Sequence, residues 1–246
     1  MRFFLYNIRY GTGRRKQKAW MDMLRKTDKH LPKITDLIRR FNPDVIGLVE
    51  VDTGSFRTGG IDQAEAIAED IGSYFHRCEV KYSKGGFFDS LPVFNKQANA
   101  ILTRGAIRRE RFHYLHYGFK RLVIELELET INLFLVHLSL RFGTRQRQLA
   151  DLHDLVKSST KPCVVMGDFN ALTGASEMKL FLAASGLTSV NTNHLPTYPS
   201  WHPTRELDFI CYTEGITFRD FMIPETTLSD HLPLVCDLKI PGEPEK

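Results

Sequence analysis

Six short polar motifs lie at the ends of apolar runs in this chain, and this pattern restricts its fold more than any other feature. The motifs are LYNIRYG with Asn7, GLVEVD with Glu50, LVHLS with His137, MGDFNA with Asp168, ELDFI with Asp208, and LSDHLP with Asp230 and His231. Short apolar runs bounded by polar residues are typical of buried β-strands. We therefore expect sheets whose edges carry the polar side chains.

The spacing of apolar residues between these runs predicts helices. Residues 32–41 have Pro32 in the first turn of a predicted helix and apolar residues on one face. Helical spacing also extends over 61–71, 145–159 and 175–186. Strands are expected at 2–8, 44–51, 74–80, 99–104, 121–129, 131–139, 163–168, 206–212, 215–223 and 232–240.

Several neighbouring strands are joined too tightly for parallel crossovers. The segment 121–129 alternates apolar and acidic residues, which predicts a strand with one solvent-exposed face. Only Thr130 separates it from 131–139, so we expect these two strands to pair antiparallel. Because helices alternate with such tightly joined strands, the pattern favours mixed sheets covered by helices, an α/β (α+β) fold.

Length and composition predict a globular domain. The chain has 246 residues, of which 42% are hydrophobic and 25% charged, and it contains no internal repeat or linker. We expect one domain over 1–246, with its core in 2–240 and a polar tail in 241–246. No apolar run reaches the roughly 18 to 20 residues that span a bilayer, and the N-terminal segment lacks a secretory cleavage pattern. These features predict a cytoplasmic monomer without a transmembrane segment.

Four cysteines are widely spaced, at positions 78, 163, 211 and 236. This spacing fits neither a zinc site nor a disulfide framework. Three of the four lie inside strand-like runs. We therefore expect buried, reduced thiols.

The net charge of +4 is unevenly distributed along the chain. The first 41 residues hold 12 Lys and Arg against 3 Asp and Glu, and they include the basic loop 13–30. Such a loop could bind nucleic acid or an acidic membrane surface, or it could be a solvated loop without a partner. A second loop, 82–95, contains Phe87 and Phe88, which could stack on bases or enter a membrane interface together with Trp20.

Carboxylates, amides and imidazoles at strand ends are the groups that metal-assisted hydrolysis of a phosphate ester requires. Mg²⁺ binds oxygen ligands, usually one or two carboxylates together with substrate phosphate and water. A carboxylate or imidazole takes a proton from the attacking water, and other groups stabilise charge on the phosphorus oxygens. Each motif alone is weak evidence, because GDFN could form only an Asx-turn. The ordered set is the strong indication.

In their order along the chain, these motifs resemble the endonuclease/exonuclease/phosphatase superfamily, over residues 3 to about 238. The resemblance implies a four-layer α/β-β/α sandwich of two mixed, largely antiparallel sheets flanked by helices, with the motifs at one mouth. It also implies that Glu50 is the principal Mg²⁺ ligand, with Asn7 beside it. Asp230 would complete the metal region directly or through water, and Mn²⁺ could replace Mg²⁺.

The resemblance implies five catalytic residues. Asp168 would orient or deprotonate the attacking water, and Asn170 would hold that water or the phosphate. His231 would donate a hydrogen bond to a non-bridging phosphate oxygen, while Asp208 fixes the tautomer of the imidazole. His137 would help to protonate the leaving oxygen, as the second histidine of the deoxyribonuclease and sphingomyelinase branches does.

Three further residues are candidates for substrate binding. Apurinic endonucleases carry an acidic residue two positions after the N-terminal Asn, where this chain has Arg9, which argues against abasic-site cleavage. Arg9 could bind a substrate phosphate or a neighbouring carboxylate. Arg121, at the start of a predicted strand, has a supporting role in this interpretation. Trp201, in TYPSWHPTRELDFI, either contacts substrate or covers a packed loop.

These observations predict a Mg²⁺-dependent phosphoester hydrolase, specifically a phosphodiesterase that acts on nucleic acid by in-line attack of water. The first alternative is a phospholipid or sphingolipid phosphodiesterase at a membrane surface. The second is a catalytically silent binding module, which is disfavoured because every polar position of the set holds a chemically competent residue.

Overall fold

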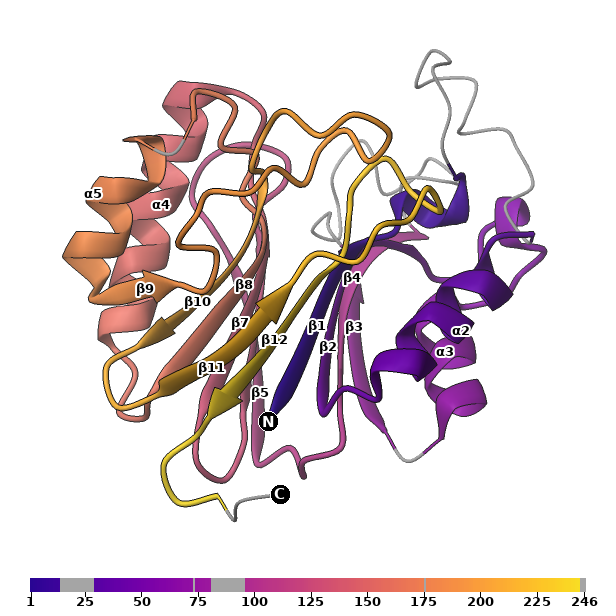
Figure 1. The fold of residues 1–246 in the computed structure, drawn as a ribbon, viewed down its shortest axis with the longest axis horizontal. Helices are drawn as coiled ribbons and strands as arrows, with labels where there is room; N and C mark the ends of the chain where they lie inside the picture. Colours follow the sequence, from indigo (N-terminus) through magenta and orange to yellow (C-terminus); the bar gives the residue numbers. More distant parts are fainter. Residues whose placement is uncertain (14–28, 73, 81–95, 175, 244–246) are drawn as a thin grey trace.

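Six strands form a first sheet in the order β11-β12-β1-β2-β4-β3 (Figure 1). The structure is a computed structural model that describes residues 1–13, 29–72, 74–80, 96–174 and 176–243. The strands of this sheet are β1 (Arg2–Asn7), β2 (Val45–Asp52), β3 (Phe75–Val80), β4 (Gln97–Thr103), β11 (Thr217–Met222) and β12 (Leu234–Lys239). The β1–β2 pair is parallel, and the other pairs in the sheet are antiparallel.

A second sheet of six strands has the order β5-β6-β7-β8-β10-β9. Its strands are β5 (Arg109–Tyr114), β6 (Leu122–Glu127), β7 (Asn132–His137), β8 (Cys163–Asp168), β9 (Leu187–Ser189) and β10 (Asp208–Thr213). Here β7 and β8 are parallel and the remaining pairs antiparallel. Both sheets are therefore mixed and largely antiparallel, as predicted.

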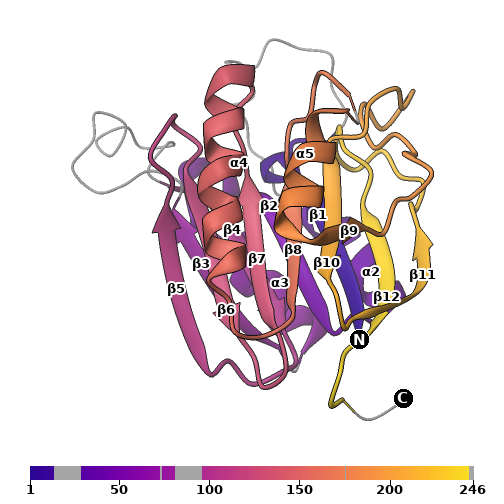
Figure 2. The ribbon, with the colours of Figure 1, turned by 90° about the vertical axis from the view of Figure 1, so that its left-hand side faces the viewer.

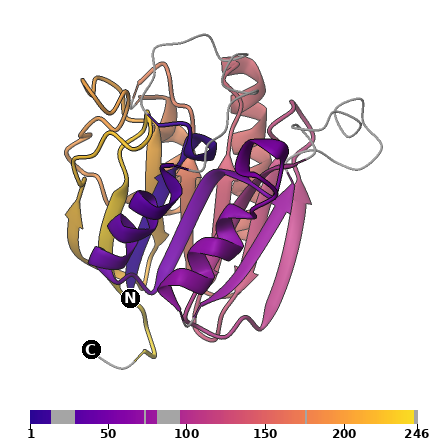
Figure 3. The same ribbon diagram turned by 90° about the vertical axis from the view of Figure 1, so that its right-hand side faces the viewer.

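Helices cover the outer face of each sheet. The first sheet carries α2 (Leu31–Phe41) and α3 (Gln63–Ile71), which Figure 3 shows in front of its outer face. The second carries α4 (Phe142–Lys157) and α5 (Ser176–Ser185), seen face-on in Figure 2. Two short 3₁₀ helices, η1 (Arg9–Gly11) and η2 (Phe56–Thr58), follow β1 and β2. The predicted four-layer α/β-β/α sandwich is confirmed.

Local sequence explains where the helices over the first sheet begin and end. Helix α2 has a proline in its first turn and stops at Asn42, which adopts the left-handed conformation that ends many helices. Helix α3 starts after Asp62, whose carboxylate accepts hydrogen bonds from the backbone N–H groups of Ala64 and Glu65. Each helix then buries one apolar face against the sheet, which supplies most of its stability.

Three apolar layers hold the sandwich together. The central layer lies between the sheets, where Phe3 and Ile101 of the first sheet pack with Ile124 and Met166 of the second. Two further layers join the first sheet to α2 and α3 and the second to α4 and α5. Gly47 in β2 lets the sheets approach closely, because a Cβ there would lie 3.0 Å from the sulfur of Met166. Burial of each large side chain contributes about 1.5–3 kcal/mol.

The sequence analysis did not predict two strands, and it was wrong about one exposed face. Strand β9 has only three residues, and β5 is a charged edge strand without an apolar run. Its side chains cover the acidic face of β6, so Glu125 is buried and accepts a hydrogen bond from Arg111. His113 lies 2.6 Å from the same carboxylate. The expected solvent-exposed face of 121–129 is therefore largely covered by β5.

Several other predictions can be compared with the structure. Residues 14–28 of the basic loop and the whole aromatic loop 82–95 lie outside the described residues. None of the four cysteines, all within the described residues, forms a disulfide; those at 163, 211 and 236 are buried, as expected, whereas Cys78 is half-buried. Among the described residues, no helix is long and apolar enough to cross a membrane.

Candidate active site

The fold brings the predicted site residues to one edge of the sandwich, drawn at the top of Figure 1. The parallel pair β1–β2 carries Asn7 at the end of β1 and Glu50 near the end of β2, and the parallel pair β7–β8 ends there at His137 and Asp168. Strand β10 runs the other way, so its first residue, Asp208, lies opposite Asp168. Asp230 and His231 come immediately before β12, which is antiparallel to β1. The edge is thus formed by strand ends that are distant in sequence.

Asp168 connects the two sheets at this edge. One carboxylate oxygen accepts a hydrogen bond from Asn7 Nδ2 at 3.0 Å, and the other accepts one from the backbone N–H of Asn170 at 3.0 Å. The side chain of Asn170 in turn donates to the carbonyl of Leu138 at 3.0 Å. Burial raises the pKa of Asp168 to about 6, although the nearby His231 charge opposes that shift. The pKa of this carboxyl group therefore lies above the usual range for aspartate.

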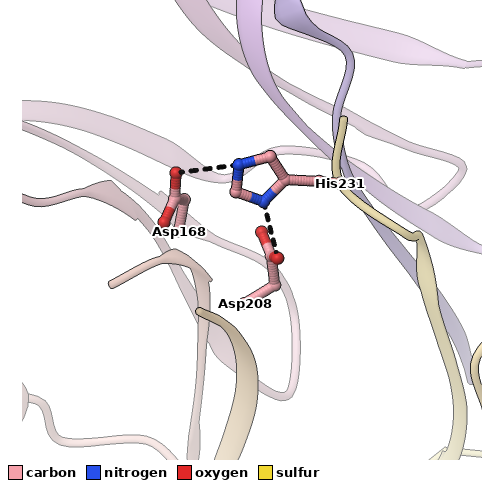
Figure 4. Close-up of side chains that lie close together, drawn as sticks. All are labelled: Asp168, Asp208 and His231. Atoms are coloured by element: carbon pink, nitrogen blue, oxygen red, sulfur yellow. Dashed lines mark hydrogen bonds and ion pairs between the residues drawn. The ribbon is translucent and has the colours of Figure 1, made fainter. Parts of the chain in front are cut away.

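His231 and Asp208 form an oriented pair (Figure 4). Nδ1 of His231 lies 2.8 Å from Oδ2 of Asp208, which also accepts a 2.6 Å hydrogen bond from the Thr197 hydroxyl. The other ring nitrogen, Nε2, lies 3.9 Å from Asp168 Oδ2. Burial lowers the pKa of His231, but the Asp208 and Asp168 carboxylates outweigh it and raise that pKa to about 10. The imidazole is consequently charged at neutral pH.

A second histidine lies between two carboxylates. His137 Nε2 is 3.4 Å from Asp168 Oδ2 and 3.8 Å from Glu50 Oε1. Lys120 Nζ donates to the same ring nitrogen and lies 3.9 Å from Glu50 Oε1. The sequence analysis missed Lys120, because it belongs to no motif and is brought here by the β5–β6 loop. Its neighbour Arg121 was selected instead.

Glu50 projects into the site from a β-bulge. The β2–β4 register shifts between Leu48 and Val51, and Glu50 adopts a left-handed backbone conformation with φ +58°. Its N–H donates to Asn99 Oδ1 at 3.3 Å. Bulges redirect side chains beside functional sites, and a left-handed non-glycine residue carries backbone strain. Asn170 and Arg9 share this conformation, with φ values of +51° and +47°.

The three predicted substrate-binding residues lie in different surroundings. Arg9 Nε is 3.5 Å from Asp230 Oδ2, so this arginine contacts a carboxylate of the site. Trp201 is half-buried and follows Ser200, whose N–H donates to the Asp230 carbonyl at 2.7 Å. Arg121 lies near Tyr114, where burial raises the tyrosine pKa to about 12 and the arginine charge opposes that shift. The roles of all three in substrate binding remain predictions.

Oxygen ligands for a cation are available at two places. Asp168, Asp208 and His231 present ligand atoms within 4.8 Å of one another, but His231 Nδ1 and Asp208 Oδ2 already bind each other. The predicted group, Asn7, Glu50 and Asp230, consists of an amide and two carboxylates, a type of donor set that suits Mg²⁺. Asn7 Oδ1 already accepts a hydrogen bond from the Arg9 N–H at 3.1 Å. Burial raises the pKa of both Asp168 and Asp230, and the Glu50 charge adds to each shift. A cation would relieve this repulsion between carboxylates, and its ligands remain a prediction.

A buried arginine that the sequence analysis did not select fixes the loops after β7 and β8. Arg145 is fully buried in α4 and donates to the carbonyls of Ser139 and Leu140 at 2.8 and 2.9 Å. It also pairs with Glu177 at 2.9 Å, and Glu177 accepts a hydrogen bond from the Thr173 hydroxyl. The loops that follow His137 and Asp168 are therefore tied to one buried ion pair.

Comparison with known proteins agrees with this geometry. The model of the endonuclease/exonuclease/phosphatase family matches residues 5–231. A UPF0294 protein from Klebsiella pneumoniae is 27% identical over 118 residues, which cover 48% of this chain and 44% of that protein. The chain thus matches less than half the length of this curated relative.

Two solved structures share the fold. An endonuclease/exonuclease/phosphatase from Beutenbergia cavernae is 20% identical with a TM-score of 0.74, covering 97% of this chain and 71% of that one. The catalytic domain of human Nocturnin, solved with a bound sulfate anion, is also 20% identical with a TM-score of 0.70, covering 98% and 93%. Together with the family match, the assembled site identifies the chain as a member of the endonuclease/exonuclease/phosphatase family of phosphoester hydrolases.

Proposed function

We propose that this protein is a Mg²⁺-dependent phosphodiesterase that cleaves nucleic acid by in-line attack of water. The position of Asp168 carries the proposal. Its buried carboxylate is held by Asn7 and Asn170 and faces the charged imidazole of His231 across 3.9 Å. A group that can take a proton from water therefore lies beside a donor for the phosphate oxygen.

The pKa values of these two groups suit opposite tasks. A pKa of about 6 leaves Asp168 ionised at neutral pH and still basic enough to orient or deprotonate water. A pKa of about 10 keeps the proton on His231, whose Nε2–H donates to a non-bridging phosphate oxygen. Asp208 holds the ring through Nδ1, so that Nε2 points toward the reacting groups.

Asn7, Glu50 and Asp230 would hold the cation in this proposal. Bound Mg²⁺ would supply positive charge to the phosphate oxygens and help ionise water. Mn²⁺, which also accepts oxygen ligands, could replace it. Arg9 would bind a further phosphate oxygen from the Asp230 side of the site.

His137 and Lys120 would protonate the leaving oxygen in this proposal. Lys120 contacts His137 Nε2 and can donate a hydrogen bond to that ring nitrogen. The pair lies beside both Asp168 and Glu50, within reach of a phosphate held between them. A proton delivered from this pair to the departing oxygen completes the cleavage.

Nucleic acid is the proposed substrate because cationic side chains border the site. Arg9 and Lys120 contact its carboxylates, and exposed arginines lie beyond them. The sulfate bound to the Nocturnin catalytic domain gives an example of a phosphate-like anion held by a protein of this fold. The alternative lipid substrate depends on Trp20 and Phe87-Phe88, which lie outside the described residues.

The test measures cleavage of plasmid DNA, single-stranded RNA, mixed phospholipid vesicles and bis(p-nitrophenyl) phosphate, with Mg²⁺ and with EDTA. The Asp168→Asn variant supplies the background, and Asp154→Asn, on the exposed face of α4, is the matched control. We expect Mg²⁺-dependent cleavage of nucleic acid that only Asp168→Asn abolishes. Cleavage of lipid alone would replace the proposed substrate, and no cleavage of any ester would favour a silent binding module.

A further inference from the structure

Exposed aromatic and apolar side chains border the active site on the side of the second sheet. They belong to two adjoining segments, 116–121 between β5 and β6 and 139–147 at the start of α4, which we call the rim. The exposed fractions are 44% for Tyr117, 69% for Phe119, 58% for Leu140 and 54% for Phe142. A group of large apolar side chains in water commonly marks a binding surface.

The rim is also basic. Segments 116–121 and 139–147 contain no Asp or Glu, whereas they hold Lys120, Arg121, Arg141 and Arg147. A further arginine, Arg145, is buried and paired with Glu177, and His116 Nδ1 lies 3.2 Å from Asp151. Arg141 and Arg147 are exposed and line an open cavity of about 380 Å³ with Gly143 and Thr144. A polyanion is the partner whose charge complements this surface.

The rim is held in place before any ligand binds. The buried side chain of Gln148 donates to the carbonyls of Tyr117 and Lys120 at 2.8 and 2.6 Å, and accepts from the Ser139 N–H at 2.8 Å. The guanidinium of Arg147 lies over the Tyr117 ring, 4.6 Å from its centroid. Because these contacts fix both segments, binding would require little ordering of the protein.

The rim continues directly into the catalytic residues. Lys120 lies at the end of segment 116–121 and contacts both Glu50 and His137. A nucleic-acid strand with its scissile phosphate near Asp168 would therefore contact Lys120 first and then the exposed aromatic rings beyond it. Substrate on this path would contact the rim and the catalytic centre together.

We propose that the rim binds single-stranded nucleic acid, with bases stacked on Phe119 and Phe142 and phosphates paired with Arg141 and Arg147. This inference rests on the proposed nuclease function, which places the scissile phosphate at the catalytic centre. Stacking requires unpaired bases, since a duplex keeps its base faces covered. Arg141 directly precedes Phe142, and Arg147 lies over Tyr117, so charged and apolar side chains alternate; this fits a chain of alternating phosphates and bases better than a continuous bilayer.

Binding is tested without catalysis, in EDTA and in the Asp168→Asn background, by fluorescence anisotropy of a labelled oligothymidylate of about twelve nucleotides. Phe119→Ser and Arg141→Ser are each introduced, with Phe75→Ser as control. Phe75 is similarly exposed, at 54%, but lies at the start of β3, at the end of the first sheet opposite the site. Thermal melting of each variant excludes unfolding as a cause.

We expect Phe119→Ser to weaken binding roughly tenfold, and Arg141→Ser to weaken it and lower its salt dependence. Phe75→Ser should bind as the background protein does. Unchanged binding in both rim variants, equal affinity for duplex, or binding only to phosphatidylserine vesicles would each overturn the inference. Cleavage of bis(p-nitrophenyl) phosphate by the unmodified protein alongside such a result would leave the proposed chemistry standing. Rim-dependent binding without any esterase activity would support the binding surface and contradict the proposed hydrolase function.

Discussion

Replacing the buried carboxylate of Asp168 should stabilise the metal-free protein while it abolishes hydrolysis. Burial raises the pKa of this group from 3.8 to about 6, and each pKa unit corresponds to about 1.4 kcal/mol. Ionised Asp168 therefore opposes folding by roughly 3 kcal/mol relative to the protonated form. The pKa of this group is higher in the folded state than in the unfolded state. The contribution of the protonated carboxyl group to the free energy of unfolding is therefore fully present below pH 3.8 and is lost as the pH rises through about 6.

Asparagine removes the charge but keeps the shape. Asp168 accepts hydrogen bonds from Asn7 and from the backbone of Asn170, and an amide can satisfy only one of these donors. The mismatch costs about 1–2 kcal/mol. The net expectation for Asp168→Asn is a gain of about 1–2 kcal/mol at neutral pH in EDTA, which disappears as the pH is lowered toward 4.

Urea denaturation followed by circular dichroism at several pH values measures this difference. Asp154→Asn, which neutralises an exposed carboxylate on α4, should leave the unfolding free energy nearly unchanged at every pH. The reasoning would be refuted if Asp168→Asn destabilised the protein at neutral pH. It would also be refuted if the effect of the substitution did not change between neutral and acidic pH.

Three further predictions concern stability and turnover. Gly167→Ala should destabilise the protein by about 3 kcal/mol or more in urea denaturation, because the added Cβ would lie 2.0 Å from a carbonyl oxygen of β7. As a control, a Cβ at Gly143 in α4 would meet no atom within 4 Å, so Gly143→Ala should be neutral or stabilising. Glu177→Gln should cost about 3–5 kcal/mol in the same assay, because it leaves the buried Arg145 charge without its carboxylate. Lys120→Met should lower kcat/KM for any phosphate ester about tenfold to a hundredfold, measured by steady-state hydrolysis.

The sequence was sufficient to predict most of the fold because apolar runs and tight connections are local features. The antiparallel pairing across Thr130 follows from a one-residue separation, and α2 from its apolar face and Pro32. Strand β5 could not be predicted in this way, because its charged residues form no apolar run and its strand structure depends on pairing with β6. The burial of Glu125 depends on the same contact.

The site shows a similar division between motif residues and their neighbours. Asp168 and His231 lie in recognisable motifs, so their positions at the sheet edge could be predicted from the strands alone. Lys120 and Arg145 could not be selected, because one reaches the site from a loop and the other acts through carbonyl groups and Glu177. Arg121 was selected because it resembles an arginine that family members place at the equivalent strand start, and nothing in the sequence pattern indicated its neighbour Lys120.

The strained residues of the site lie beside buried ion pairs, one associated with each sheet. On the first sheet, Asp52 pairs with the buried Arg57 at 2.7 Å, two residues after the left-handed Glu50. The guanidinium of Arg57 also lies 4.6 Å from the ring centroid of Tyr10, in the turn that carries Arg9.

On the second sheet, the Arg145–Glu177 pair anchors the loop that contains the left-handed Asn170. A buried ion pair contributes little net stability compared with apolar packing, yet its geometry is narrowly fixed. Both pairs lie beside left-handed backbone at the candidate site, so we infer that they hold these loops in one conformation. Packing in the three apolar layers then stabilises the fold, and the two buried pairs fix the orientation of the proposed catalytic groups.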